Sequence, residues 1–274
     1  MPDSPLISLV IAVYNKADVL RLVLAAVGRQ SFREFEVIVA DDGSGEEVKE
    51  MIAEAGNVHG YPITHLWHED KGWRKNTMLN NAIRASKSEY LVFIDGDCIP
   101  GRRFLEDHWA EHEKMKVLLG RRVEMSERWA RRLSLEMVKD GRFEKLGLSE
   151  LVDGLRGTAI RLEDGIRLRN RIIRKLSMRE SRSILGSNFS LHKEDIVAIN
   201  GFDEMYDGPG HGEDSDIQYR LSLIGVKGKS LRNLAVQYHV WHPRTNVSEN
   251  SLRRFEEVRK SQSPMCKRGL KTLD

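Results

Sequence analysis

Tyr90-Leu-Val-Phe-Ile-Asp-Gly-Asp97 is the stretch of sequence that decides the fold. Its first five residues are apolar and favour a strand that is buried on both faces, as in a parallel sheet covered by helices. The strand then ends in two carboxylates around a glycine, which lets the backbone turn tightly. The stretch therefore predicts an α/β protein with acidic groups at a strand end.

Strand and helix patterns alternate through the first 125 residues. We expect strands at Ile7–Val13, Phe35–Ala40, Ile63–Trp67, Tyr90–Ile94 and Val117–Leu119. We expect helices at Ala17–Gln30, Glu46–Ala55, Lys75–Ala85 and Phe104–Lys114. This order predicts a mixed, mostly parallel sheet flanked by helices. Right-handed crossovers place the carboxyl ends of its strands along one edge, where open α/β sheets bind ligands.

Polar groups follow four of these five strands. They are Tyr14-Asn15, Asp41-Asp42-Gly43-Ser44, Glu69-Asp70-Lys71-Gly72 and Asp95-Gly96-Asp97. One acidic turn after a strand is usually turn chemistry or a helix N-cap. Four such turns on one edge instead indicate a site. The carboxylates of Asp95 and Asp97 suit a hard divalent cation that also holds a diphosphate.

The second half of the chain carries two further candidate groups. Gly212-Glu213-Asp214-Ser215-Asp216 opens a helix expected at Glu213–Ile224. Its acids complement the helix dipole, but the glycine-rich loop before them favours a general base. His239-Val240-Trp241-His242-Pro243 overlaps a strand expected at Ala235–Trp241, and imidazole suits Mn²⁺-type ions. In a regular strand His239 and His242 face opposite sides, so one of them binds metal unless the strand ends between them.

The net charge of +3 is unevenly distributed. Residues 121–182 contain 17 basic and 10 acidic residues, a net charge of +7, which leaves the rest of the chain at −4. We expect helices in this segment at Trp129–Val138, Leu148–Leu155 and Ile166–Leu176. The segment is either an ordinary solvated helical insert or a contact for an anionic membrane surface or acceptor. Nucleic acid is excluded as a partner, because the rest of the domain is net negative and carries no matching motif.

Further features of composition bear on where the protein works. The two cysteines, Cys98 and Cys266, cannot form a disulfide framework and favour a reducing compartment. The N-terminus reads as a first strand rather than a signal peptide, and no apolar run is long enough to span a membrane. The expected location is the cytoplasm, either free or peripheral on the inner face of the membrane.

Together the motifs resemble those of a family 2 glycosyltransferase with the GT-A nucleotide-sugar-binding fold. The later half also resembles the carboxyl-terminal part of galactosyl- and N-acetylgalactosaminyltransferases. The matching stretches are Ser8–Asn15, Asp41–Ser44, Lys71–Arg74, Ile94–Asp97, Gly186–Asn188, Asn200–Glu204 and Gly212–Asp216. They occur in the family's order over residues 6–126 and 184–243. Trp73, His211 and the stretch 127–182 depart from the family pattern.

The resemblance implies a role for each matching residue. Nucleotide-sugar binding falls to Tyr14, Asp41, Asp42, Lys71, Gly72, Arg74 and Asp95. Asp97 would ligate Mn²⁺ or Mg²⁺, and His239 or His242 would complete the coordination. Asp214 would deprotonate the acceptor hydroxyl, and Glu213 would hold the sugar or acceptor. The implied reaction is metal-dependent, inverting transfer from a UDP-sugar to a glycan or lipid-linked acceptor in surface polysaccharide or lipopolysaccharide synthesis.

The predicted organisation is a single catalytic domain over residues 1–245. Its nucleotide-sugar half covers residues 1–126, the basic helical insert 127–182 and the acceptor half 183–245, and a basic helix and loose tail follow over 246–274. Two alternatives remain open: a non-catalytic nucleotide-sugar-binding protein and a sugar-phosphate nucleotidyltransferase. The latter expects a glycine-rich basic loop after the first strand, where the chain has Asn15-Lys16-Ala17-Asp18. A nicotinamide-dependent oxidoreductase is excluded, since no G-x-G-x-x-G follows that strand.

Overall fold

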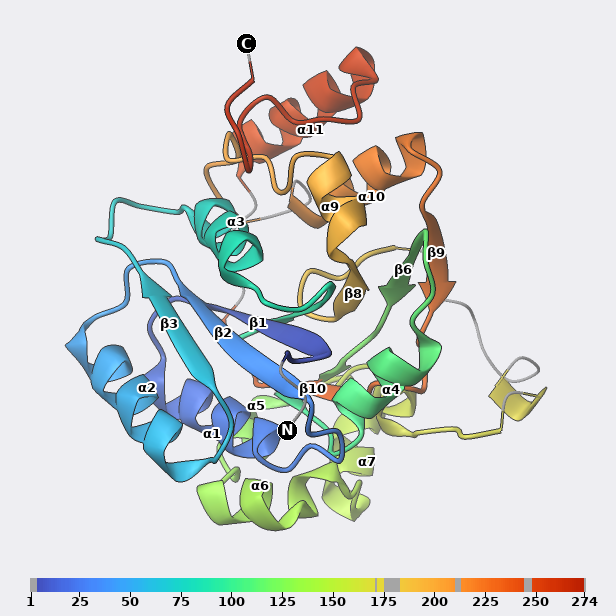
Figure 1. The fold of residues 1–274 in the computed structure, drawn as a ribbon. Helices are drawn as coiled ribbons and strands as arrows, with labels where there is room; N and C mark the ends of the chain where they lie inside the picture. Colours follow the sequence, from blue (N-terminus) through green and yellow to red (C-terminus); the bar gives the residue numbers. More distant parts are fainter. Residues whose placement is uncertain (1–3, 171, 175–182, 210–212, 244–247, 274) are drawn as a thin grey trace.

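A seven-stranded sheet lies at the centre of the fold, with strand order β3-β2-β1-β4-β8-β6-β9 (Figure 1). The computed structural model describes residues 4–170, 172–174, 183–209, 213–243 and 248–273. Strands β1 to β4 are parallel, β8 is antiparallel to β4 and β6, and β6 is parallel to β9. The predicted mixed, mostly parallel sheet is confirmed. Its strands are β1 Ile7–Val13, β2 Phe35–Asp41, β3 Ile63–Trp67, β4 Tyr90–Asp95, β6 Lys116–Leu119, β8 Phe189–His192 and β9 Lys227–Ser230.

Helices cover both faces of this sheet (Figure 1). Alternate residues of a strand point to opposite faces, so Leu9 and Ile11 of β1 join one apolar cluster while Val10 and Ala12 join the other. The first cluster includes side chains of α1 and α2, and the second includes side chains of α3, α9 and α10. These helices are α1 Ala17–Val27, α2 Glu46–Val58, α3 Lys75–Ala85, α9 Lys193–Ala198 and α10 Glu213–Leu223.

A second, three-stranded sheet connects the acidic turn of the first half to the later half of the chain. It consists of β5 Cys98–Pro100, β7 Val123–Glu124 and, between them, β10 Gln237–His239. β10 is antiparallel to β5 and parallel to β7, and the register places His239 opposite both Cys98 and Glu124. The small sheet therefore brings the predicted histidines beside the turn that contains Asp97.

The basic segment is less regular than predicted. The helix expected at Trp129–Val138 is two helices, since the Ser126 and Ser134 side chains each cap a separate N-terminus. The helix expected at Ile166–Leu176 is wrong for residues 166–170, which are irregular because Leu168 N donates to the carbonyl of Asn233. Residues 171 and 175–176 lie outside the described part. The helices observed around this segment are α4 Phe104–Glu111, α5 Glu127–Ala130, α6 Leu135–Asp140 and α7 Leu148–Leu155, with 3₁₀ turns at Arg142–Glu144 and Leu162–Gly165.

Three other elements have different limits in the structure from those predicted. The helix expected to reach Gln30 ends at Val27, because the Gln30 side chain turns inward and bonds to Gly101 O and Leu105 N. The helix expected to reach Lys114 ends at Glu111. The strand expected at Ala235–Trp241 is only Gln237–His239, since Ala235 has a left-handed φ of 42°.

The carboxyl-terminal segment packs against the body of the protein. It begins with α11, Glu249–Ser261. The tail expected to be loose is instead hydrogen-bonded: Asn200 Nδ2 donates to the carbonyls of Cys266 and Lys271, both at 2.8 Å. Arg84 of α3 donates to the carbonyl of Leu270 at 2.7 Å. The described tail, residues 262–273, is therefore part of the fold.

Candidate active site

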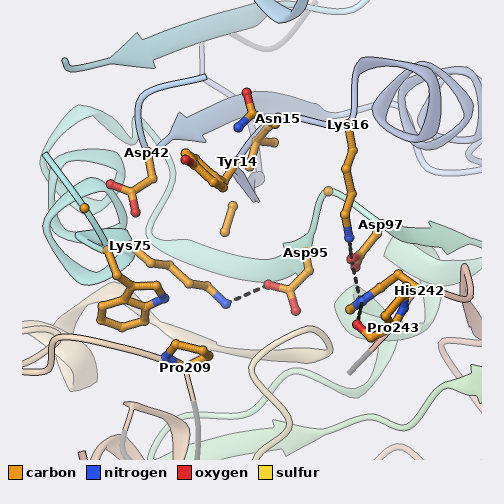
Figure 2. A pocket seen from close by; sticks show the side chains of 15 residues that line it. Tyr14, Asn15, Lys16, Asp42, Lys75, Asp95, Asp97, Pro209, His242 and Pro243 are labelled. Carbon is orange, nitrogen blue, oxygen red and sulfur yellow. Dashed lines mark hydrogen bonds and ion pairs between the residues drawn. The ribbon is translucent and has the colours of Figure 1, made fainter. Parts of the chain in front are cut away.

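A cavity of about 530 Å³ lies at the carboxyl edge of β1 and β4 (Figure 2). The turns after these strands line it together with the start of α3 and two later loops. Of the predicted site residues, the lining includes Tyr14, Asp42, Gly72, Asp95, Asp97 and His242. Figure 2 shows Tyr14 and Asp42 at one end, Asp97 and His242 at the other, and Asp95 between them. The expected convergence of the strand ends is thus observed.

The end of the cavity at Tyr14 is formed by an aromatic ring and a fixed carboxylate. Tyr14 is 54% exposed, and its hydroxyl donates to Asp70 Oδ2 at 2.9 Å. Asp42 is held from two sides, by His68 Nε2 at 2.7 Å and by the backbone N–H of Arg74 at 2.8 Å. An exposed ring beside an oriented acceptor suits a planar base that stacks and donates a hydrogen bond.

Asp41 has different surroundings from Asp42. It is fully buried and is not among the residues that line the cavity. His65 Nε2 lies 2.9 Å from its Oδ2, and the backbone N–H of Ser44 donates to its Oδ1 at 2.8 Å. Burial raises the pKa of Asp41, but these hydrogen bonds outweigh burial and hold the pKa below its usual value. In this structure Asp41 shapes the turn that presents Asp42.

The cations of the predicted Lys71–Arg74 stretch lie outside the cavity lining. The ammonium of Lys71 is exposed and pairs with Glu69 at 3.0 Å. The guanidinium of Arg74 donates to the carbonyl of Glu69, while its backbone N–H orients Asp42. Both side chains therefore interact with their own loop, and Gly72 and Trp73 supply this stretch's contribution to the lining.

Two lysines that the sequence analysis missed line the cavity instead. Lys75 Nζ lies 2.8 Å from Asp95 Oδ1, and Lys16 Nζ lies 3.3 Å from Asp97 Oδ2 (Figure 2). Both ammonium groups lie where a diphosphate would need positive charge. The periodicity of α3 contained the signal for Lys75, because it shares the face of Leu79 and Ala82, which pack on the sheet.

Asp97, His239 and His242 form a cluster in which the ligand atoms lie within 4.8 Å of one another. Asp97 Oδ1 is 3.6 Å from His239 Nε2, and Asp97 Oδ2 is 3.3 Å from His242 Nε2. Both histidines reach Asp97 because β10 ends at His239, so the opposite-face limit of a regular strand does not apply. Burial raises the pKa of Asp97, but the adjacent imidazoles of His239 and His242 outweigh burial and hold that pKa well below its usual value.

The hydrogen bonds of the two imidazoles fit a cation between them. His239 Nδ1 lies 2.6 Å from a carboxylate oxygen of Glu124, and His242 Nδ1 lies 2.8 Å from the carbonyl oxygen of Pro243. Since both partners accept, each Nδ1 donates its proton outward. The two Nε2 atoms then face each other at 3.2 Å next to Asp97. One carboxylate and two imidazole nitrogens are a ligand set that suits Mn²⁺.

Asp214 lies on the first turn of α10 and is not among the residues that line the cavity. The backbone N–H of Gly186 donates to its Oδ2 at 3.4 Å. Burial raises the pKa of Asp214, and hydrogen bonds from the backbone N–H groups of Ser215 and Gly186 lower it in part, so the pKa stays above its usual value. The charge of Lys75 also acts on Asp214. A carboxylate with a raised pKa is suited to accepting a proton near neutral pH.

Glu213 begins α10, but its side chain lies outside the described part of the structure, as do residues 210–212 of the glycine-rich loop. The predicted role of Glu213 therefore stays a prediction. Pro209, the last described residue before residues 210–212, lines the cavity (Figure 2).

Comparison with known proteins identifies the family. The sequence model of glycosyl transferase family 2 matches residues 8–175, which is more than half of the chain. The chain belongs to glycosyl transferase family 2. A second model, described as the N-terminal domain of galactosyltransferase, matches residues 171–243. Both resemblances inferred from the motifs are thereby confirmed.

Curated relatives of this family 2 chain are longer proteins. Chondroitin synthase of Escherichia coli is 27% identical over 253 residues, which cover 85% of this chain and 34% of that protein. Validoxylamine A glucosyltransferase of Streptomyces hygroscopicus subsp. jinggangensis is 27% identical over 285 residues, covering 94% and 62%. The chain thus spans from about a third to under two thirds of the length of these relatives.

Solved structures with the same fold include complexes with nucleotides. S. aureus TarS 1–349 in complex with UDP superimposes with a TM-score of 0.60 at 19% identity, covering 93% of this chain and 64% of that 1–349 chain. Mannosyltransferase PcManGT of Pyrobaculum calidifontis, in complex with GDP-Man and Mn²⁺, gives a TM-score of 0.56 at 14% identity and covers 95% and 70%. At these identities the likeness establishes the GT-A fold of the family 2 chain.

Proposed function

We propose that this chain transfers a sugar from a UDP-sugar to a hydroxyl of a glycan or lipid-linked acceptor, with a divalent cation and inversion at the anomeric carbon. One observation carries the proposal. A stacking ring with a fixed acceptor, two lysines, Asp97 and His242 line one cavity in the order that a base, a diphosphate and a metal would require (Figure 2), and His239 completes the cluster with Asp97 and His242. Surface polysaccharide or lipopolysaccharide synthesis is the proposed setting, supported by the chondroitin synthase relative.

The donor would lie along the cavity from Tyr14 to His242. Tyr14 stacks on the base, and Asp42 accepts the imide N–H of uracil. Lys75 and Lys16 stand beside the diphosphate, with Asp95 close to the ribose or the metal. Gly72 and Trp73 form part of the cavity wall. We retain Asp41, Lys71 and Arg74 as proposed contributors through the loops that they stabilise.

The cation site would consist of Asp97, His239 and His242, and the cation would be Mn²⁺ or Mg²⁺. When bound, such an ion offsets the charge that develops on the leaving nucleoside diphosphate. PcManGT holds Mn²⁺ in its own structure, which supports this choice. Two imidazole ligands favour Mn²⁺ over Mg²⁺.

Asp214 would act as the general base. The acceptor oxygen attacks the anomeric carbon as the bond from that carbon to the diphosphate oxygen breaks. The hydroxyl proton passes to Asp214, and the bonding electrons leave with UDP. The attack comes from the face opposite the leaving group, so a single displacement inverts the anomeric centre. Glu213 is proposed to hold the sugar or acceptor.

Two substitutions separate binding from catalysis. Asp214→Asn should lower sugar transfer by about 10²–10⁴-fold, because the base is lost, while Mn²⁺-dependent UDP binding stays intact. Asp97→Ala should lose Mn²⁺-dependent UDP binding. UDP release from a panel of UDP- and GDP-sugars with lipid-linked acceptors measures turnover, and calorimetry measures binding. Asp18→Asn, an exposed acid on α1, is the matched control.

The outcomes discriminate between the functions considered. Near-normal turnover by Asp214→Asn would show that another group is the base. Tight UDP binding by the wild type without turnover of any donor would favour a non-catalytic binding protein. Release of pyrophosphate from a nucleoside triphosphate and a sugar phosphate would instead favour the nucleotidyltransferase.

We also propose an anionic membrane surface as a partner, placed on α7. Much positive charge of the basic segment is taken up internally, as in the pairs of Arg128 with Asp153 and Arg132 with Glu150. The outer face of α7 nevertheless exposes Leu148, Leu151, Val152 and Leu155 as one apolar stripe. Exposed Arg156 and Arg161 flank it. An apolar stripe with adjacent arginines fits a surface rich in acidic lipids.

Location and domain organisation stay proposals. Within the described residues, no helix has the length and apolar character needed to cross a membrane. We propose a cytoplasmic protein, either free or peripheral on the inner face of the membrane. We also propose that the chain is organised into a nucleotide-sugar half (1–126), a basic helical insert (127–182), an acceptor half (183–245) and a basic carboxyl-terminal segment (246–274).

A further inference from the structure

His239 also has fixed contacts on the side of its ring that points away from Asp97. His239 lies on the middle strand of the three-stranded sheet, and the register places Glu124 directly opposite it on β7. Met125 N donates to the carbonyl of His239 at 3.1 Å, so the backbone is fixed on this side. The Glu124 carboxylate consequently meets the imidazole through the strand pairing itself.

Glu124 is held in turn by Arg122. The Nε of Arg122 donates to Glu124 Oε1 at 2.8 Å, while Oε2 lies 2.6 Å from His239 Nδ1. The same guanidinium reaches Ser187 Oγ at 3.1 Å and lies 4.0 Å from Asp95 Oδ2. Each oxygen of the Glu124 carboxylate therefore has its own hydrogen-bond partner, and the two bonds together fix the orientation of the carboxylate toward His239.

We propose that Glu124 is a positioning residue for the metal site: it keeps the proton of His239 on Nδ1 and so leaves the Nε2 lone pair facing Asp97 and His242. This inference rests on the cation site of the proposed function, and it adds a residue to which that proposal gives no role. A carboxylate behind a ligating imidazole fixes the ring and its tautomer and makes the ligand more basic. The backbone carbonyl oxygen of Pro243 fixes the ring and the tautomer of His242 in the same way.

The geometry indicates what a neutral amide would do at position 124. A glutamine has one acceptor oxygen, which Arg122 and His239 would have to share. If Arg122 takes the oxygen, the amide NH₂ faces His239 Nδ1, and the imidazole proton moves to Nε2. The atom that faces Asp97 would then carry a proton and no longer ligate.

Mn²⁺ affinity tests this inference without any activity measurement. Electron paramagnetic resonance of free Mn²⁺ is used to titrate the wild type, Glu124→Gln, Glu124→Asp and the control Glu127→Gln, whose carboxylate pairs with Arg131 on α5. Loss of such a partner typically costs 10- to 100-fold in metal affinity, so we expect a weakening of about that size for Glu124→Gln. Glu124→Asp should recover part of it, and Glu127→Gln should match the wild type.

The tautomer of His239 is the second readout. Long-range ¹H–¹⁵N spectra of the metal-free protein, recorded at a pH high enough for the His239 imidazole to be neutral, should show the Nδ1–H form in the wild type and a shift toward Nε2–H in Glu124→Gln. Equal Mn²⁺ affinity and an unchanged tautomer in a folded Glu124→Gln would overturn the inference while leaving the cation site in place. Absence of Mn²⁺ binding by the wild type would overturn both.

Discussion

Lys71 and Lys75 are close in sequence but have different surroundings. The Lys71 ammonium is exposed and pairs with Glu69, whereas Lys75 lines the cavity and contacts Asp95. At the residue scale, the resemblance implied Lys71 and Arg74 as the cations of the nucleotide-sugar site, whereas Lys75 and Lys16 line the cavity. Lys71 lies in the loop before α3, and Lys75 is the first residue of α3. The direction of each side chain therefore depends on where the helix begins.

Substitution of these two lysines tests the assignment. Lys75→Met should weaken UDP binding in the presence of Mn²⁺ roughly ten- to a hundredfold, because hydrogen bonds to charged groups contribute about 1.5–3 kcal/mol. Lys71→Met should change the affinity for UDP by less than about threefold, since exposed ion pairs contribute little free energy. Calorimetric titration with UDP measures both. A larger loss for Lys71→Met than for Lys75→Met would contradict the placement.

Among the elements, strands β1 to β4 were the most predictable. The apolar runs of β1, β2 and β4 are buried on both faces, whereas β3 is a partly exposed edge strand. The predicted limits Ile7–Val13 and Ile63–Trp67 match to the residue. The later elements depend on distant partners. Residues 166–170 look helical by periodicity, but Leu168 bonds to Asn233, far along the chain. Glu124 escaped notice because β7 has two residues and no periodic pattern.

The loop between β2 and α2 depends on one glycine. Gly43 has a φ of +93°, and a Cβ there would lie 2.6 Å from the Cα of Asp70. Gly43→Ala should therefore lower the free energy of unfolding by at least about 1–2 kcal/mol, and it should weaken UDP binding by displacing Asp42. Urea unfolding and UDP titration measure the two effects.

Gly45 provides the matched control for that loop. It has a φ of −70°, and a Cβ there would meet nothing within 4 Å. Gly45→Ala should change the free energy of unfolding by no more than about 0.5 kcal/mol. Similar unfolding midpoints for the two variants would show that the approach of Asp70 does not constrain the loop.

For the whole molecule, the α7 surface would set its orientation on a membrane. Leu148 and Leu155 are 83% and 89% exposed, so their replacement should leave the fold intact. Leu148→Ser/Leu155→Ser should reduce co-sedimentation with anionic vesicles at least about tenfold, because burying each leucine contributes about 1.5–3 kcal/mol. Val58→Ser, an exposed apolar residue on α2, is the control.

The lipid dependence of the wild type decides that proposal. Binding to vesicles with acidic lipids should exceed binding to zwitterionic vesicles. Equal binding to both, no binding to either, or full binding by the double variant would remove the membrane surface as a partner of α7.

The three-stranded sheet also has a consequence for the order of folding. β5 and β10 meet although Cys98 and Gln237 are 139 residues apart in sequence. Closing so long a loop is slow, so the acidic turn would form before the imidazoles arrive beside it. A cation that binds only the finished cluster would favour the docked state, by about 2.7 kcal/mol at a concentration 100 times its Kd. Metal supply would then influence how much of the chain completes its fold.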